Sequence, residues 1–132
     1  INTYEKIYEG DTIAILGLGS FYHLGKKVKE KLKEEMGINA TLINPRYITG
    51  LDKEMLEELT ENHQVVITLE DGIINGGFGE KIARFYSDTN IKVKNYGIKK
   101  AFYDKYNVNE LLQENKLTPE QIAKEVEEVI KK

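Results

Sequence analysis

The residue in this sequence best suited to bind an anion is Arg46. The chain has 19 basic side chains, yet Arg46 and Arg84 are its only arginines. Arg46 follows an apolar run and comes directly after Pro45, so it stands at the outlet of an expected strand. Its planar guanidinium can form two parallel hydrogen bonds with a phosphate or carboxylate, which lysine cannot do. The residues alone leave open whether Arg46 binds a ligand or forms a salt bridge with Glu70 or Asp71.

A glycine-rich loop, Gly76-Gly77-Phe78-Gly79, is a second candidate for anion binding. It precedes an expected helix, and backbone N–H groups at a helix N-terminus bind anions well. The same glycines would also let the loop pass close to another part of the backbone, and this packing role is the favoured interpretation. Phe78 fits either the core or a contact between subunits. Glu70 is a candidate acceptor of hydrogen bonds from the neighbouring loops.

Other motifs that suggest chemistry are incomplete. The turn Gly17-Leu18-Gly19-Ser20 lacks the third glycine of a dinucleotide fingerprint, because position 22 is a tyrosine, so a plain tight turn is favoured. Neither His23 nor His63 has a serine or cysteine placed beside it, and a surface or capping role is expected for each. The chain has no cysteine, and its His, Asp and Glu residues lack the spacing of metal ligands. The sequence therefore predicts neither a catalytic triad nor a metal site.

Strands and helices must alternate to position these loops. Apolar runs predict four strands, the last with the alternation of an edge strand: Thr12–Leu16, Ile38–Ile43, Gln64–Glu70 and Ile91–Tyr96. Five helices are expected: one from an N-cap at Ser20 to Gly37, one from the Asp52 cap, one after the glycine-rich loop, one over Val108–Gln113, and one from the capping box Thr118-Pro119-Glu120-Gln121.

This order of elements predicts an α/β fold with three layers, helix–sheet–helix, around a mostly parallel sheet of four or five strands. Ligands of such sheets bind at the carboxyl ends of the strands, where the turn after Leu16, the Arg46 segment and the glycine-rich loop should meet. We expect residues 1–132 to form one domain, because no linker or repeat divides them. The first six residues show no organised start, which suggests a piece of a longer chain.

The composition argues against several classes of partner. The net charge is -3, and lysines are spread among glutamates, which does not favour nucleic-acid binding. No apolar run approaches the roughly 20 residues of a membrane-spanning helix, and the start has no signal-peptide pattern. We therefore expect a cytoplasmic protein with no nucleic-acid or membrane partner.

Three blocks of sequence together resemble the C-terminal domain of transketolase-like thiamine-diphosphate enzymes. They are Leu42 to Asp52, with Asn44-Pro45-Arg46-Tyr47 at its centre, then Leu69-Glu70-Asp71-Gly72 with the glycine-rich loop, and then Tyr96-Gly97-Ile98 with Phe102. Each block alone is a weak signal, and their shared order and spacing make the resemblance specific. It covers about Glu9 to Val129 and is strongest to the 1-deoxy-D-xylulose-5-phosphate synthases.

The resemblance implies a full-length transferase that condenses pyruvate with D-glyceraldehyde 3-phosphate, losing carbon dioxide, with thiamine diphosphate and Mg²⁺. Its product would feed isoprenoid, thiamine and pyridoxal synthesis. The cofactor and metal motifs belong to the N-terminal and central domains, so this C-terminal fragment alone is expected to bind neither and to be inactive. It would support a homodimer and contribute Arg46 to the phosphate of the sugar substrate. Tyr47, Glu70 and the loop Gly76, Gly77, Phe78 and Gly79 are supporting candidates.

The sequence departs from the family pattern in two places. Thr49-Gly50 stands where lysine-proline is usual, so a second cation is missing, and Lys99-Lys100 follow Ile98 in place of proline-aspartate. Transketolase and the β subunits of 2-oxo acid dehydrogenases share the implied fold and remain alternatives. A purely structural module, forming a dimer through Phe78 and the aromatics around Phe102, is another. A free-standing nucleotide-binding domain is a third hypothesis.

Overall fold

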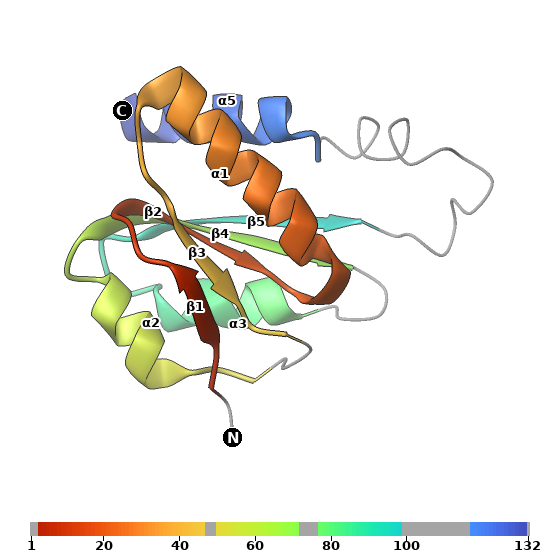
Figure 1. The fold of residues 1–132 in the computed structure, drawn as a ribbon. Coiled ribbons are helices and arrows are strands. Elements are labelled where there is room, and N and C mark those ends of the chain that lie inside the picture. The colour runs from red at the N-terminus through yellow and green to blue at the C-terminus, as the bar shows by residue number, and fades with distance from the viewer. Residues whose placement is uncertain (1–2, 47–49, 72–76, 99–116, 132) are drawn as a thin grey trace.

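The computed structural model describes residues 3–46, 50–71, 77–98 and 117–131, in which a five-stranded sheet lies between two layers of helices (Figure 1). The strands lie in the order β1-β3-β2-β4-β5. β1 is antiparallel to β3, and the other neighbours are parallel. The predicted three-layer, mostly parallel sheet is confirmed. The strands are β1 (Glu5–Tyr8), β2 (Thr12–Gly17), β3 (Thr41–Asn44), β4 (His63–Asp71) and β5 (Lys92–Ile98).

The central strands follow the apolar runs in the sequence. β2 and β4 lie side by side in the middle of the sheet, and nearly all of their described side chains are buried. β3 begins at Thr41 rather than at Ile38, and it ends directly before Pro45, which lacks the N–H needed to continue the ladder. β5 lies at one edge of the sheet, as its alternation predicts.

β1 corrects the expectation that the first residues lack organised structure. Three of its four residues are exposed, because the strand lies at the second edge of the sheet, and so it leaves no apolar run in the sequence. Tyr4, just before it, is buried. The Tyr4 N–H donates to Asp52 Oδ2 at 2.9 Å, and its hydroxyl donates to the Gly50 carbonyl at 2.5 Å. These bonds join the start of the chain to the start of the second helix.

The first helix begins later than predicted. A 3₁₀ turn, η1 (Gly19–Phe21), comes first, and α1 spans Tyr22–Met36 with Phe21 as its N-cap. Ser20 is therefore not the cap, because it lies inside the preceding turn. The C-terminal prediction is confirmed: Gly37 adopts a left-handed conformation with φ 67° and donates its N–H to the Lys33 carbonyl, which favours glycine.

Two of the remaining described helices, α2 and α5, begin at the predicted caps, whereas α3 begins earlier than predicted, inside the glycine-rich loop. α2 (Lys53–Leu59) is capped by Asp52, whose carboxylate accepts a hydrogen bond from the Met55 N–H at 3.2 Å. α3 spans Phe78–Phe85 and α5 spans Pro119–Lys131. Thr118 and Gln121 form the capping box of α5, each side chain accepting from the other's backbone N–H. The helix expected over Val108–Gln113 lies outside the described residues.

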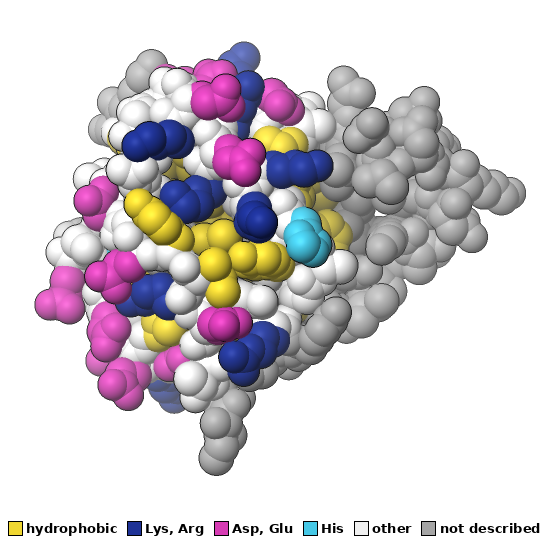
Figure 2. Space-filling model, in the orientation of Figure 1, with side chains coloured by type: hydrophobic (Ala, Val, Ile, Leu, Met, Phe, Trp, Pro, Cys, Tyr) yellow, Lys and Arg dark blue, Asp and Glu magenta, His cyan; other side chains and the backbone are white. Residues whose placement is uncertain are grey.

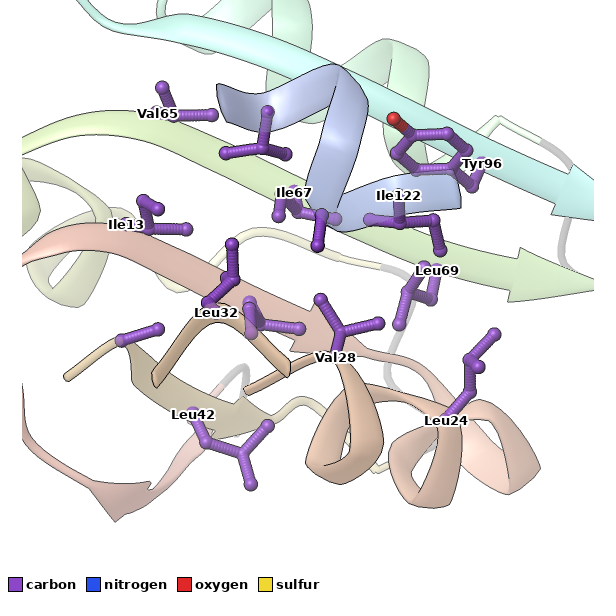
Figure 3. Packing of buried hydrophobic residues seen from close by; sticks show 14 of the residues in the cluster. Ile13, Leu24, Val28, Leu32, Leu42, Val65, Ile67, Leu69, Tyr96 and Ile122 are labelled. Atoms are coloured by element: carbon purple, nitrogen blue, oxygen red, sulfur yellow. The ribbon is translucent and has the colours of Figure 1, made fainter. Parts of the chain in front are cut away.

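Each face of the sheet has its own buried cluster, formed by the helices of this chain. α1 and α5 cover one face, and α2 and α3 cover the other (Figure 1). On the first face, Val28 and Leu32 of α1 point towards β-strand residues such as Ile67 (Figure 3). On the second face, Phe78 and Ile82 of α3 and Leu56 of α2 are fully buried. No helix among the described residues is long and apolar enough to cross a membrane.

A buried histidine connects three segments at the amino ends of the strands. His63 Nδ1 lies 3.1 Å from the carbonyl of Leu59, the last residue of α2, and this carbonyl can only accept, so Nδ1 carries the proton. His63 Nε2 then accepts from the Thr41 hydroxyl at 2.7 Å, while Thr41 Oγ1 accepts from the Gly10 N–H at 2.9 Å. Of the surface or capping role predicted for each histidine, His63 has the capping role and the surface alternative is wrong for it, because its ring is buried. His23 is exposed.

This arrangement predicts a loss of stability in acid. Burial lowers the pKa of His63 below its ordinary value of 6.5, so the unfolded chain takes up a proton at a higher pH than the folded chain. Stability should therefore be complete above about pH 6.5 and fall as the pH drops below it, by at most about 1.4 kcal/mol per pH unit from this group. Urea unfolding at several pH values measures the slope. His63→Gln should remove the part of this slope that comes from His63.

Candidate functional site

The turn after β2 connects the carboxyl ends of the neighbouring strands. The Leu18 N–H donates to the Leu69 carbonyl in β4 at 2.9 Å, and the Gly19 N–H donates to the Arg46 carbonyl beyond β3 at 2.7 Å. A Cβ at Gly17 would lie 2.8 Å from the Phe21 carbonyl oxygen, so the tight turn needs glycine there. The structure thus confirms a tight turn and brings two of the predicted loop segments together at this edge of the sheet.

Arg46 is held in an unusual backbone conformation at this edge. Its φ is 63°, in the left-handed region that non-glycine residues rarely adopt, at a cost of roughly 1–3 kcal/mol. The Asn44 side chain accepts a hydrogen bond from the Arg46 N–H at 2.7 Å, and the Gly19 bond holds its carbonyl. These two hydrogen bonds therefore fix the direction in which the Arg46 side chain leaves the backbone. Backbone strain of this kind is common at functional sites.

Among the described side chains, the guanidinium of Arg46 forms a loose ion pair with Glu5 and none with Glu70; the side chain of Asp71, the other expected partner, lies outside the described part of the structure. Nη2 lies 3.7 Å from Glu5 Oε1, and the two side chains are 58% and 49% exposed. The antiparallel register pairs Glu5 with Asn44, which brings Glu5 beside Arg46. Sequence reasoning missed this partner because it did not predict β1. An exposed pair at this distance contributes little, so the guanidinium remains accessible to an anion.

The N-terminus of α3, next to the glycine-rich loop, is already occupied by the carboxylate of Glu70. Glu70 is buried near the end of β4, and its Oε2 accepts a hydrogen bond from the Gly79 N–H, in the first turn of α3, at 2.6 Å. A carboxylate in this position is stabilised by the helix dipole. It would also repel a ligand phosphate. The described part of the loop therefore supports the packing interpretation, and Glu70 has the predicted role of accepting from a neighbouring loop.

Gly79 allows α3 to approach the sheet closely. A Cβ there would lie 2.7 Å from Asn95 Cγ and 2.8 Å from Glu70 Oε2. Asn95 is itself held by the Thr68 hydroxyl, which donates to its Oδ1 at 2.6 Å. Gly77 precedes the helix with φ 100°, a conformation that favours glycine. Gly76 and Tyr47, also candidate site residues, lie outside the described residues.

Phe78 belongs to the core. It is fully buried in the cluster beneath α3, and its ring meets the Tyr4 ring edge to face, with centroids 6.4 Å apart. The alternative in which Phe78 forms a contact between subunits is therefore wrong, because the side chain has no exposed surface. The aromatic region around Phe102 lies outside the described residues.

The described residues do not fit a metal or a cofactor diphosphate. Among them, no three His, Asp or Glu side chains are grouped so that they could hold a metal ion. The N-terminus of α3 faces the Glu70 carboxylate, so it does not offer the positive cradle that a diphosphate needs. What this edge of the sheet does offer is an exposed guanidinium on a fixed backbone, which suits the binding of a phosphate or carboxylate.

Residues 3–122 match the family model "Transketolase, C-terminal domain". The chain belongs to this family. Among curated proteins it is 35% identical over 125 residues to the 1-deoxy-D-xylulose-5-phosphate synthase of Shouchella clausii, and 38% identical over 125 residues to that of Clostridium tetani. Each match covers 93% of this chain and 20% of the relative. The chain therefore spans about a fifth of the length of these relatives.

A solved structure titled "Split gene transketolase, inactive beta4 tetramer" has the same fold as this transketolase C-terminal domain. The TM-score is 0.79 at 25% sequence identity, and the match covers 96% of this chain and 42% of that one. The resemblance that the three sequence blocks indicate, to the C-terminal domain of the synthases, is confirmed by the family and its relatives. These comparisons do not test the role of Arg46.

Proposed function

We propose that this chain is the C-terminal domain of a 1-deoxy-D-xylulose-5-phosphate synthase, in which Arg46 binds the phosphate of the acceptor substrate. The full enzyme would condense pyruvate with D-glyceraldehyde 3-phosphate and release carbon dioxide. Thiamine diphosphate and Mg²⁺, held by the N-terminal and central domains, would supply the carbanion chemistry. The C-terminal domain would also support a homodimer. The names of the relatives support the enzyme class, and the Arg46 geometry supports the phosphate role.

One observation carries the role of Arg46. Its guanidinium is exposed at the carboxyl edge of a parallel sheet, while its backbone is held on both sides by the Asn44 side chain and by Gly19. These bonds fix the direction in which the side chain leaves the backbone, and the guanidinium stays exposed to an incoming anion. A phosphate dianion carries more charge than the Glu5 carboxylate and can accept two hydrogen bonds from the guanidinium, so it can displace the loose 3.7 Å pair. Glu5 would then be a weak competitor for the substrate.

Replacing Arg46 with alanine in the full-length enzyme tests this role. We expect KM for D-glyceraldehyde 3-phosphate to rise roughly tenfold to hundredfold, because a charged hydrogen-bonded contact contributes about 1.5–3 kcal/mol. KM for unphosphorylated glyceraldehyde should change little. Arg46→Lys should give an intermediate value, because it keeps the charge and loses the two-point contact. Steady-state kinetics with both acceptors provide the measurement.

Two further variants serve as controls for this experiment. Arg84→Ala removes the other arginine, which is exposed in the last turn of α3, and should leave both KM values unchanged. Glu5→Gln removes the competing carboxylate and should lower KM for the phosphorylated acceptor slightly. Equal effects of Arg46→Ala on both acceptors would refute phosphate binding and favour the structural role. A full-length enzyme that uses a ketose donor or a lipoyl acceptor instead would favour the transketolase or 2-oxo acid dehydrogenase alternatives.

A further inference from the structure

A groove separate from the Arg46 edge lies between α1 and the β1 edge of the sheet. It has a volume of about 590 Å³, within the usual range for ligand sites. The helix α1 covers β2 and β3 but leaves the strip beside β1 open. Figure 2 shows apolar side chains gathered in the middle of this face with lysine or arginine side chains around them. The lining residues are Ile7, Tyr8, Tyr22, Lys26, Lys29, Glu30, Lys33, Asn39 and Leu42.

Two apolar side chains of the groove are more exposed to solvent than the other large hydrophobic side chains that the structure describes. Ile7 and Tyr8 are 42% and 44% exposed, and they are the large hydrophobic side chains that stand out as exposed among the described residues. Tyr22 and Leu42 continue the apolar surface towards the interior. Apolar side chains that remain in water beside a hollow gain free energy when an apolar group covers them.

The polar part of the groove is positively charged. Lys26, Lys29 and Lys33 line it from successive turns of α1, against a single carboxylate, Glu30. In the part of the chain that the structure describes, the ion pairs of α1 involve Lys31 instead. Lys29 Nζ lies 3.7 Å from the centre of the Tyr8 ring, and Lys33 Nζ donates to Asn39 Oδ1 at 2.9 Å. These contacts hold two of the ammonium groups over the groove without neutralising them.

We propose that this groove binds an organic anion with an apolar body, whose ring or branched chain lies on Ile7 and Tyr8 and whose acidic group meets the lysines of α1. The charge complementarity selects an anion over a neutral or cationic ligand. Burial first, and the nearby charge of Lys33 second, lower the pKa of Lys29. The site does not depend on the role proposed for Arg46.

Fluorescence titration of the protein with anilinonaphthalene sulfonate tests the proposal, because this anion has an apolar ring system and fluoresces when it leaves water. We expect saturable binding with one site per chain. The double variant Lys29→Gln/Lys33→Gln should weaken it roughly tenfold, because it removes two of the partly exposed charges that meet the anion. Lys27→Gln, an exposed lysine of α1 outside the groove, should leave the affinity unchanged.

A neutral analogue separates the two parts of the site. Phenylnaphthylamine has a similar ring system without the sulfonate, so it should bind more weakly and should not respond to the lysine variants. Ile7→Ser should weaken both probes, and circular dichroism should confirm that the half-exposed position tolerates the change. Non-saturable binding, or equal affinity in the double lysine variant, would overturn the proposal.

Competition identifies the acidic group. Naphthoate and naphthyl phosphate carry a carboxylate and a phosphate on the same apolar body, and displacement of the fluorescent probe by either one supports the site. Displacement by neither contradicts it.

The titration is repeated with the full-length enzyme. Loss of the lysine-dependent binding there would show that other parts of the polypeptide cover the groove, and it would also contradict a ligand site. An unchanged response to Arg46→Ala keeps this result separate from the test of the proposed function.

Discussion

Replacing Phe78 with alanine is expected to lower the free energy of unfolding by about 3–5 kcal/mol, the usual loss when a buried phenylalanine leaves a cavity. Phe78 is fully buried, and its ring meets Tyr4, whose hydroxyl is bonded to the Gly50 carbonyl. The cavity would therefore open between α3 and the segments that enter α2. Because those segments are held by their own hydrogen bonds, they can collapse into the space only in part. Urea unfolding followed by circular dichroism measures the change.

Phe85→Ala is the matched control for Phe78, because Phe85 lies on the same helix and is only partly buried. Its loss of stability should be clearly smaller. The result also separates the core role of Phe78 from the subunit contact that the sequence left open. A subunit contact would appear as dissociation in sedimentation experiments with little change in the stability of the monomer, and that outcome would contradict the burial of the ring.

A methyl group at Gly79 is expected to cost about 3 kcal/mol, near the upper end of what overpacking costs. The new Cβ would lie 2.7 Å from Asn95 Cγ and 2.8 Å from Glu70 Oε2. Glu70 is buried and accepts from the Gly79 N–H, so it cannot move without losing that bond, whereas the exposed Asn95 side chain can move only by giving up its bond from Thr68. Alanine gains up to about 1 kcal/mol in helix propensity over glycine, which offsets part of the clash. Chemical denaturation of Gly79→Ala checks the net value.

A double variant identifies the clash as the cause. Asn95→Ala removes the two nearest atoms, so Gly79→Ala should cost less in that background, with a coupling of at least about 1 kcal/mol between the two positions. Glu80→Ala, an exposed change one residue along α3, should have little effect. If the costs at Gly79 and Asn95 simply add, the two groups do not collide and the close approach of α3 has another cause.

Features that depend on neighbouring residues were predictable from the sequence. The Asp52 cap, the Thr118–Gln121 capping box and the left-handed Gly37 each depend on residues within four positions along the chain, so their residue types indicate them directly. The central strands of the sheet were also predictable, because they are covered on both faces and must be apolar throughout. Ser20 is the exception, since the 3₁₀ turn moves the helix start beyond it.

Features that depend on distant residues were not predictable in this way. The exposed edge strand β1 has no apolar run to indicate it, and without β1 there was no reason to place Glu5 beside Arg46. The sequence predicted that Glu70 accepts hydrogen bonds from neighbouring loops. It did not identify the Gly79 N–H as the donor, because that contact depends on how closely α3 approaches the sheet. His63 could be assigned to capping, but its burial depends on Thr41 from another strand.

The sequence by itself therefore determined the order of the elements, the parallel sheet and the position of a lone arginine at the outlet of a strand, because periodicity and turn residues are local properties. The tertiary structure decided which charges meet. It placed the Glu70 carboxylate against the start of α3, which removes that helix N-terminus as a phosphate cradle. It also left the Arg46 guanidinium exposed, with Glu5 as a loose partner among the described side chains. These outcomes depend on strand register and helix packing, which bring together residues far apart in the chain.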